Sequence, residues 1–104
     1  MLDFYWVRDD ERFTPKLTSE RMLGGLTFEE YTALDHLWAV LRRNGIRVEF
    51  MEDGRLSAGE VVDALRITNK LTANDAAGDA AYQNLRMILR AAKQNNAGIA
   101  SLAD

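Results

Sequence analysis

The 104-residue sequence has no cysteine, one proline and one histidine. Without cysteine there is no disulfide framework and no thiolate chemistry, as is typical of proteins that fold in a reducing compartment. A single histidine, His36, also excludes a zinc site built from four nitrogen and sulfur ligands. No apolar run approaches the roughly twenty residues of a membrane-spanning helix. The opening residues MLDFYWV carry an acid and no base, unlike a signal peptide, so we expect a cytoplasmic protein.

Size and composition indicate one folded domain. Hydrophobic residues make up 47% of the chain and charged residues 28%, a mixture typical of globular proteins rather than disordered ones. The net charge of −3 is unevenly placed: residues 1–35 hold eight acids and four bases, whereas residues 36–71 hold five acids and six bases. An acidic N-terminal third disfavours nucleic acid and anionic membrane as partners and favours a basic protein.

The first half of the chain predicts one strand and two helices. The apolar and aromatic run Leu2–Val7 is typical of a strand buried on both faces. Pro15 suits the first turn of a short helix over residues 15–23, which a pair of glycines would end. Thr27 and Glu30 have the spacing of a capping box. We therefore expect a helix over residues 27–44, ended by the glycine at position 45.

The second half predicts one further strand and two longer helices. Residues 46–50 alternate apolar and charged, the pattern of a half-buried strand. Ser57, three residues before a glutamate, predicts a capped helix to about residue 70, and another helix spans about residues 74–96. Residues 98–104 are small and weakly apolar, so we expect a frayed tail. The predicted fold is a single α+β domain over residues 1–97, with about four helices packed on a short two- or three-stranded sheet.

Helical periodicity separates buried from exposed faces. In the helix over residues 27–44 the inner stripe ends on Leu41, and His36 lies on the outer face. In the next helix, Val62 lies off the inner stripe, so this helix is either contacted on two sides or exposes apolar surface. In the last helix we expect Arg86, Arg90 and Gln94 outside.

One segment resembles the second half of an EF-hand calcium loop. Residues 53–60 read DGRLSAGE, which follows the pattern of aspartate, glycine, aliphatic, serine and glutamate in such loops. The resemblance implies side-chain ligands at Asp53 and Glu60, a carbonyl ligand at Arg55 and a sharp turn at Gly54. It covers eight of the 104 residues.

The first half of the segment departs from the EF-hand pattern. Glu49 stands where the first aspartate belongs, and Met51 stands where a second oxygen ligand belongs, although a thioether is a poor ligand for a hard cation. The residues ahead of it predict a strand instead of the incoming helix. A turn followed by a capped helix explains Gly54, Ser57 and Glu60 without a metal, and we prefer this interpretation. No metal or other cofactor is expected.

No catalytic motif is evident. Gly24 and Gly25 lack the lysine and further glycines of a phosphate-binding loop, and the nucleophile motif G-x-S-x-G is absent. A lone histidine on an outer helix face has no partner to orient it as a general base. The last two helices have the order of a helix-turn-helix, but Asp75 and Asp79 would place two carboxylates against DNA phosphates. We therefore expect neither catalysis nor nucleic-acid binding.

The aromatic strand and the acids that follow it favour a protein-binding role. Aromatic side chains in a strand point to alternate faces, and tyrosine and tryptophan are enriched at interfaces. Small acidic proteins without cysteine include bacterial immunity proteins that neutralise nuclease toxins, and this analogy of size and charge makes such a role the leading hypothesis. Alternatives are a degenerate calcium-responsive module and a small enzyme that uses scattered carboxylates; a homo-oligomer is also compatible. The residues expected at the partner interface are Tyr5, Asp9, Asp10, Glu11, Glu49, Glu52 and Asp53.

Overall fold

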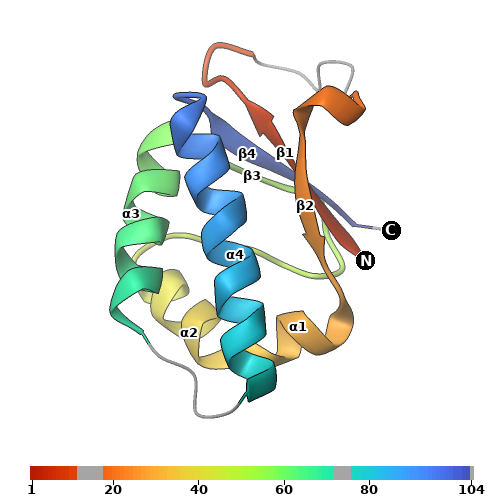
Figure 1. Cartoon of the computed structure of the whole chain (residues 1–104). Coiled ribbons are helices and arrows are strands. Elements are labelled where there is room, and N and C mark those ends of the chain that lie inside the picture. The colour runs from red at the N-terminus through yellow and green to blue at the C-terminus, as the bar shows by residue number, and fades with distance from the viewer. Residues whose placement is uncertain (12–17, 72–75, 104) are drawn as a thin grey trace.

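The computed structural model describes residues 1–11, 18–71 and 76–103, whose helices and strands form an α+β fold (Figure 1). Its elements, in chain order, are β1 (Leu2–Val7), a turn of 3₁₀-helix (Ser19–Arg21), β2 (Met22–Leu26), α1 (Phe28–Ala33), α2 (Asp35–Arg43), β3 (Gly54–Leu56), α3 (Ala58–Lys70), α4 (Ala76–Gln94) and β4 (Gly98–Ala103). The strands form one antiparallel sheet in the order β2-β1-β4-β3. Within the described ranges the sheet therefore has four strands, so the prediction of two or three was too low.

The C-terminal segment is a central strand, so the prediction of a frayed tail over residues 98–104 was wrong for residues 98–103, and residue 104 lies outside the described residues. β4 pairs with β1 along its whole length, from Leu2 opposite Ala103 to Val7 opposite Gly98. Its other edge pairs with β3. Ile99 is 1% exposed and belongs to the hydrophobic core. Small, weakly apolar residues form a strand here because both neighbours supply hydrogen-bonding partners and the helices cover one face.

The segment ahead of α1 is also a strand, although a helix had been predicted over residues 15–23. Of that prediction, residues 15–17 lie outside the described residues. Met22–Leu26 pairs antiparallel with β1, and both predicted helix-ending glycines lie within it. Gly24 has a φ of +146°, and a Cβ there would lie 3.1 Å from Ile88 of α4. Glycine therefore serves close packing of α4 onto the sheet rather than the end of a helix.

The capping boxes and the end of the predicted 27–44 helix are confirmed, but the helix divides at Leu34. Thr27 accepts a hydrogen bond from the amide of Glu30, whose side chain accepts one from the Thr27 amide. The indole of Trp38 donates to the carbonyl oxygen of Tyr31 at 2.7 Å. The same carbonyl also accepts from the Leu34 amide at 3.1 Å, so the Trp38 side chain inserts into the helical ladder at the point where α1 ends and α2 begins.

Residues 46–50 are not a strand, which corrects the second strand prediction. They run as irregular chain between α2 and β3, yet Ile46 and Val48 are 2% and 7% exposed. The Tyr31 hydroxyl donates to the Val48 carbonyl at 2.6 Å. The alternating pattern therefore reflects burial of every second residue. The strand that pairs with β4 is instead the short β3 further along the chain.

The helices lie on one side of the sheet, with α3 and α4 packed side by side and α1 and α2 below them (Figure 1). The buried residues of the helices recur at helical spacing, as expected, and include Leu34, Leu37, Trp38, Leu41, Val61, Ala64, Leu65, Ala81, Tyr82, Leu85, Ile88, Leu89 and Ala92. Arg90 and Gln94 are exposed as predicted, but Arg86, also expected outside, is half-buried. No helix in the described part of the chain is long and apolar enough to cross a bilayer.

Candidate partner-binding surface

The acidic loop after β1 makes structural contacts at two of its three acids. Asp9 accepts a hydrogen bond from the amide of Ala58, the first residue of α3, at 2.9 Å. This amide is one of the donors that a helix N-terminus leaves unsatisfied, and the carboxylate also complements the helix dipole. Asp10 is exposed. Asp9 therefore joins the loop to α3, a role the sequence pattern did not indicate.

Glu11 is held by two donors in the same region. Its Oε1 accepts from the Arg8 amide and from the Arg21 guanidinium, each at 2.9 Å. The hydrogen bonds from Arg21 and Arg8 lower the pKa of Glu11 below its usual 4.5. Arg21 also lies 4.3 Å from the centre of the Trp6 ring. The acid, the arginine and the half-buried indole form one structural cluster at the end of β1.

The segment that resembles a calcium loop forms a turn, a short strand and a helix N-terminus. Asp53 accepts from the amide of Ala103 at 2.8 Å, and Glu60 accepts from the amide of Ser57 at 2.9 Å in a complete capping box. Both carboxylates of the proposed ligand set thus bind backbone amides of the protein itself. Among the described residues, no three histidine, cysteine, aspartate or glutamate side chains form a group suited to a metal ion.

The seven residues expected at the interface fall into two separate groups. The first group follows the Val7 end of β1 and comprises Asp9, Asp10 and Glu11. Asp53 is hydrogen-bonded to Ala103, which pairs with Leu2 at the opposite end of β1. A six-residue strand separates the ends by about 20 Å. Tyr5 lies half-buried between them, paired with Ala100 and Met22. Glu49 and Glu52 belong to the group at the Leu2 end, close in sequence to Asp53.

An aromatic cluster lies at this second end, in the same region as Glu49 and Glu52. Phe28 meets Phe50 edge to face with ring centres 5.5 Å apart. Phe50 in turn lies 5.4 Å from Tyr31, which stacks on Trp38 at 4.8 Å. The inner rings are buried or half-buried, but Phe28 is 61% exposed. The cluster therefore runs from the core to the surface and ends on an exposed ring.

Acidic residues adjoin Phe28 and Phe50 in the chain. Phe28 and Glu29 line a shallow hollow with Thr32 and Ala33, and Met51, next to Phe50, is 78% exposed. We call the surface formed by Phe28, Glu29, Glu49, Phe50, Met51 and Glu52 the aromatic patch. The sequence did not single out Phe28, because aromatic residues of a small domain are mostly buried in the core. Its place directly after the N-cap Thr27 was the available signal, because the first residue of a helix often lies beyond the packed layer.

The pKa of Tyr31 reflects the charges that lie near the aromatic patch. Burial raises the pKa of this phenol above its usual 10.0, and the negative charge of Glu49 raises it further. The positive charge of Arg42 acts in the opposite direction, with a smaller upward contribution from Asp35. Glu49 therefore lies close enough to influence the cluster, and acids outweigh the single base among the charges that act on Tyr31.

Comparison with protein-family models, with curated proteins and with solved structures gives no match for this chain. A functional interpretation must therefore come from the surfaces of the molecule.

Proposed function

We propose that this chain is a non-catalytic protein-binding module for a basic protein, an immunity-type inhibitor that neutralises a partner such as a nuclease toxin. The observation that supports this proposal is Phe28, which is 61% exposed although its ring packs against Phe50. A large ring already held by neighbours offers contact area at a small cost in conformational entropy. Exposed aromatic side chains of this kind are typical anchors of protein interfaces.

The acids around the patch support a basic partner. Glu29 and Glu52 are exposed, and Glu49 is half-buried beside the cluster. An apolar centre with a charged, solvated rim is the usual anatomy of a specific interface. Opposite charge on the partner would speed association and suppress acidic competitors. Because Asp9 and Glu11 bind groups within the protein, we place the contact at the aromatic patch and not at the loop after β1.

Affinity capture tests the proposal directly. The immobilised chain should retain a basic protein from its native lysate at low salt, and mass spectrometry identifies it. Phe28→Ser should weaken the purified complex by about thirtyfold, which corresponds to about 2 kcal/mol. Met87→Ser is the matched control, because Met87 is 67% exposed on the outer side of α4. Equal binding by both variants would remove the patch from the interface.

Charge reversal separates the two groups of acids. Glu49→Lys with Glu52→Lys should slow association and reduce its salt dependence, since rim charges act mainly on the association rate. Asp10→Lys at the other end of β1 should leave the rate unchanged. If the partner is a nuclease, the wild-type chain should inhibit it and Phe28→Ser should inhibit it more weakly. Capture of no basic protein, or an effect of Asp10→Lys alone, contradicts the proposal.

A further inference from the structure

A groove runs between α3 and α4 on the side of the molecule away from the sheet. Two adjoining hollows of about 420 Å³ each share Leu65, Asn69 and Lys93 as lining residues. We call them together the α3–α4 groove, whose lining is Val62, Leu65, Arg66, Asn69, Lys70, Arg90, Lys93 and Gln94. None of these residues belongs to the aromatic patch.

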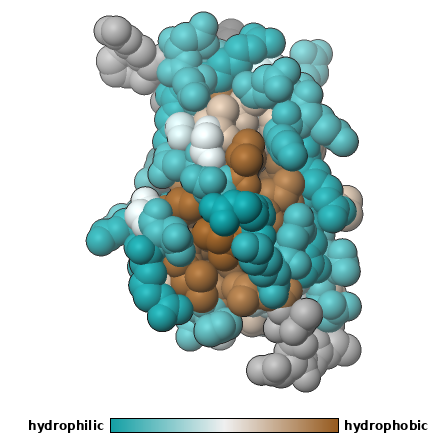
Figure 2. Space-filling view, turned by 90° about the vertical axis from the view of Figure 1, so that its left-hand side faces the viewer, coloured by the Kyte–Doolittle hydropathy of each residue, from teal (hydrophilic) through white to brown (hydrophobic). Residues whose placement is uncertain are grey.

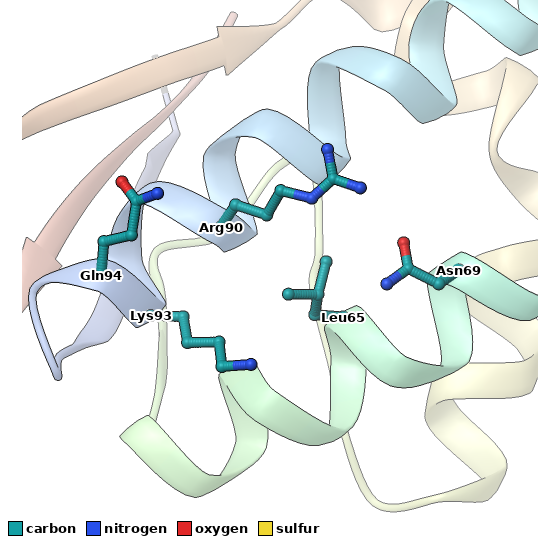
Figure 3. A pocket seen from close by; sticks show the side chains of 5 residues that line it. All are labelled: Leu65, Asn69, Arg90, Lys93 and Gln94. Atoms are coloured by element: carbon teal, nitrogen blue, oxygen red, sulfur yellow. The ribbon is translucent and has the colours of Figure 1, made fainter.

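The side chains converge from both helices. In Figure 3, Lys93 extends from α4 towards α3 and Arg90 runs along α4, while Leu65 and Asn69 point from α3 towards α4. Gln94 points away from the centre. The groove thus places two cationic groups and one amide around an aliphatic side chain.

The groove carries four cations in a chain whose net charge is −3. Arg66 meets Asp63 at 3.4 Å, with both side chains 58% exposed, and such a surface pair is weak. No ion pair within the described ranges engages Lys70, Arg90 or Lys93. Three of the four cations therefore have no acidic partner among the described residues, and their positive charge is available to a ligand.

Arg86, on the same helix as Arg90, has a structural role that Arg90 lacks. Its guanidinium donates to the carbonyl oxygens of Thr68 and Leu71, at 3.3 Å and 3.0 Å, and closes the C-terminal end of α3. One turn further along, Arg90 is exposed and has no such bond among the described residues. Arg86 thus joins α4 to α3, whereas the Arg90 guanidinium is free to bind a ligand.

An apolar component accompanies the charge. Leu65 is 6% exposed and lies at the floor, whereas Val62 is 44% exposed beside it. Figure 2 shows the side of the molecule on which α3 lies, where hydrophobic atoms gather in the middle and hydrophilic side chains surround and cross them. A free inorganic anion would use the cations and leave this apolar surface exposed.

We infer that the α3–α4 groove binds an acidic peptide segment that carries an apolar side chain between its carboxylates. Lys70, Arg90 and Lys93 would meet the carboxylates, and Val62 with Leu65 would contact the apolar side chain. Residues 62–70 of α3 span about 12 Å, the length of about four residues of extended peptide. Single-stranded nucleic acid is less suited, because it binds largely by stacking on aromatic rings, and none of the described lining residues is aromatic. This site is independent of the aromatic patch.

Fluorescence anisotropy with a labelled, acetylated hexapeptide of alternating glutamate and leucine tests the inference on the full chain. The wild type should bind it, and the double variant Arg90→Gln with Lys93→Gln should bind at least tenfold more weakly. Arg43→Gln with Arg47→Gln is the control of equal charge change, since both arginines are exposed outside the groove. The control should retain wild-type affinity.

Further measurements separate the alternatives. Val62→Ser should weaken the glutamate–leucine peptide severalfold and leave an all-glutamate hexapeptide unchanged. Phe28→Ser should bind both peptides normally, so failure of the aromatic patch and failure of the groove are distinguishable. Three outcomes overturn the inference: no binding of the peptide at millimolar concentration, equal loss in both double variants, or tighter groove-dependent binding of oligothymidine or inorganic phosphate than of the peptide.

Discussion

Substitution of Ile99 by alanine tests whether the C-terminal segment holds the sheet and the core together. Ile99 is 1% exposed, pairs with Trp6 on β1 and with Leu56 on β3, and belongs to the main hydrophobic core. The change removes three carbon atoms. At about 0.8 kcal/mol for each buried carbon, the transfer contribution is about 2.4 kcal/mol. The cavity left behind adds to this, so we expect a total of about 3 kcal/mol.

Urea unfolding followed by circular dichroism measures the effect. With a slope of about 1.5 kcal/mol per molar urea, a loss of 3 kcal/mol lowers the midpoint by about 2 M. The melting temperature should fall by about 12 °C or more. Ile99→Val should lower the free energy of unfolding by only about 1 kcal/mol, so its loss can be measured even if the alanine variant is largely unfolded.

Leu102→Ala is the matched control in the same strand. It also removes three carbon atoms, but Leu102 is half-buried and lies on the other face of the sheet, opposite Asp3. We expect less than half of the effect of Ile99→Ala. A loss below about 1 kcal/mol for Ile99→Ala, or equal losses for the two variants, would refute the assignment of β4 as a central strand.

Three further perturbations probe other parts of the fold. Gly98→Ala should lower the free energy of unfolding by about 2 kcal/mol or more, because a Cβ there would overlap the carbonyl oxygen of Leu56. Gly59→Ala should instead stabilise the chain by about 0.5 kcal/mol, since its Cβ meets only the hydroxyl of Ser57 at 3.9 Å. Thermal melts of the two variants compare these effects. Ser57→Ala removes the N-cap of α3 and should cost about 1 kcal/mol in urea unfolding, and no change would mean that the cap contributes nothing. The raised pKa of Tyr31 means that this phenol ionises first in the unfolded chain, so its contribution to stability should be constant below pH 10.0 and fall above it. In Tyr31→Phe this alkaline loss should be smaller, as urea midpoints on either side of that pH would show.

Features that depend on neighbours within one helical turn could be predicted from the sequence. Both capping boxes form as expected, at Thr27 and at Ser57. Gly45 has the left-handed φ of +79° expected after a helix. His36 is exposed, and Met87 is 67% exposed on the outer side of α4. Short-range hydrogen bonds and the 3.6-residue period decide these features, so the local sequence is sufficient.

Strands were harder to predict because their partners are distant in the chain. β4 looks like a weak tail when read alone, yet residues 98–103 pair with residues 2–7. β2 contains two glycines and read as the end of a helix, whereas close approach of Ile88 explains Gly24. Residues 46–50 have the alternation of a strand and bury Ile46 and Val48 without pairing. Periodicity reports which side chains are buried, but it does not specify which backbone supplies the hydrogen bonds.

The candidate sites show the same division between local and distant information. The sequence alone showed an acidic, cysteine-free α+β domain without a catalytic motif, and it indicated Arg90 and Gln94 on an outer helix face. Only the tertiary structure joined Phe28 to Phe50 in one cluster that reaches the surface and brought Arg90 of α4 and Leu65 of α3 to the same hollow. It also bound Asp9 and Glu11 to backbone and side-chain donors elsewhere in the protein. Composition and local spacing specify which groups a chain carries, whereas packing between distant segments decides which of those groups meet and which remain free to bind.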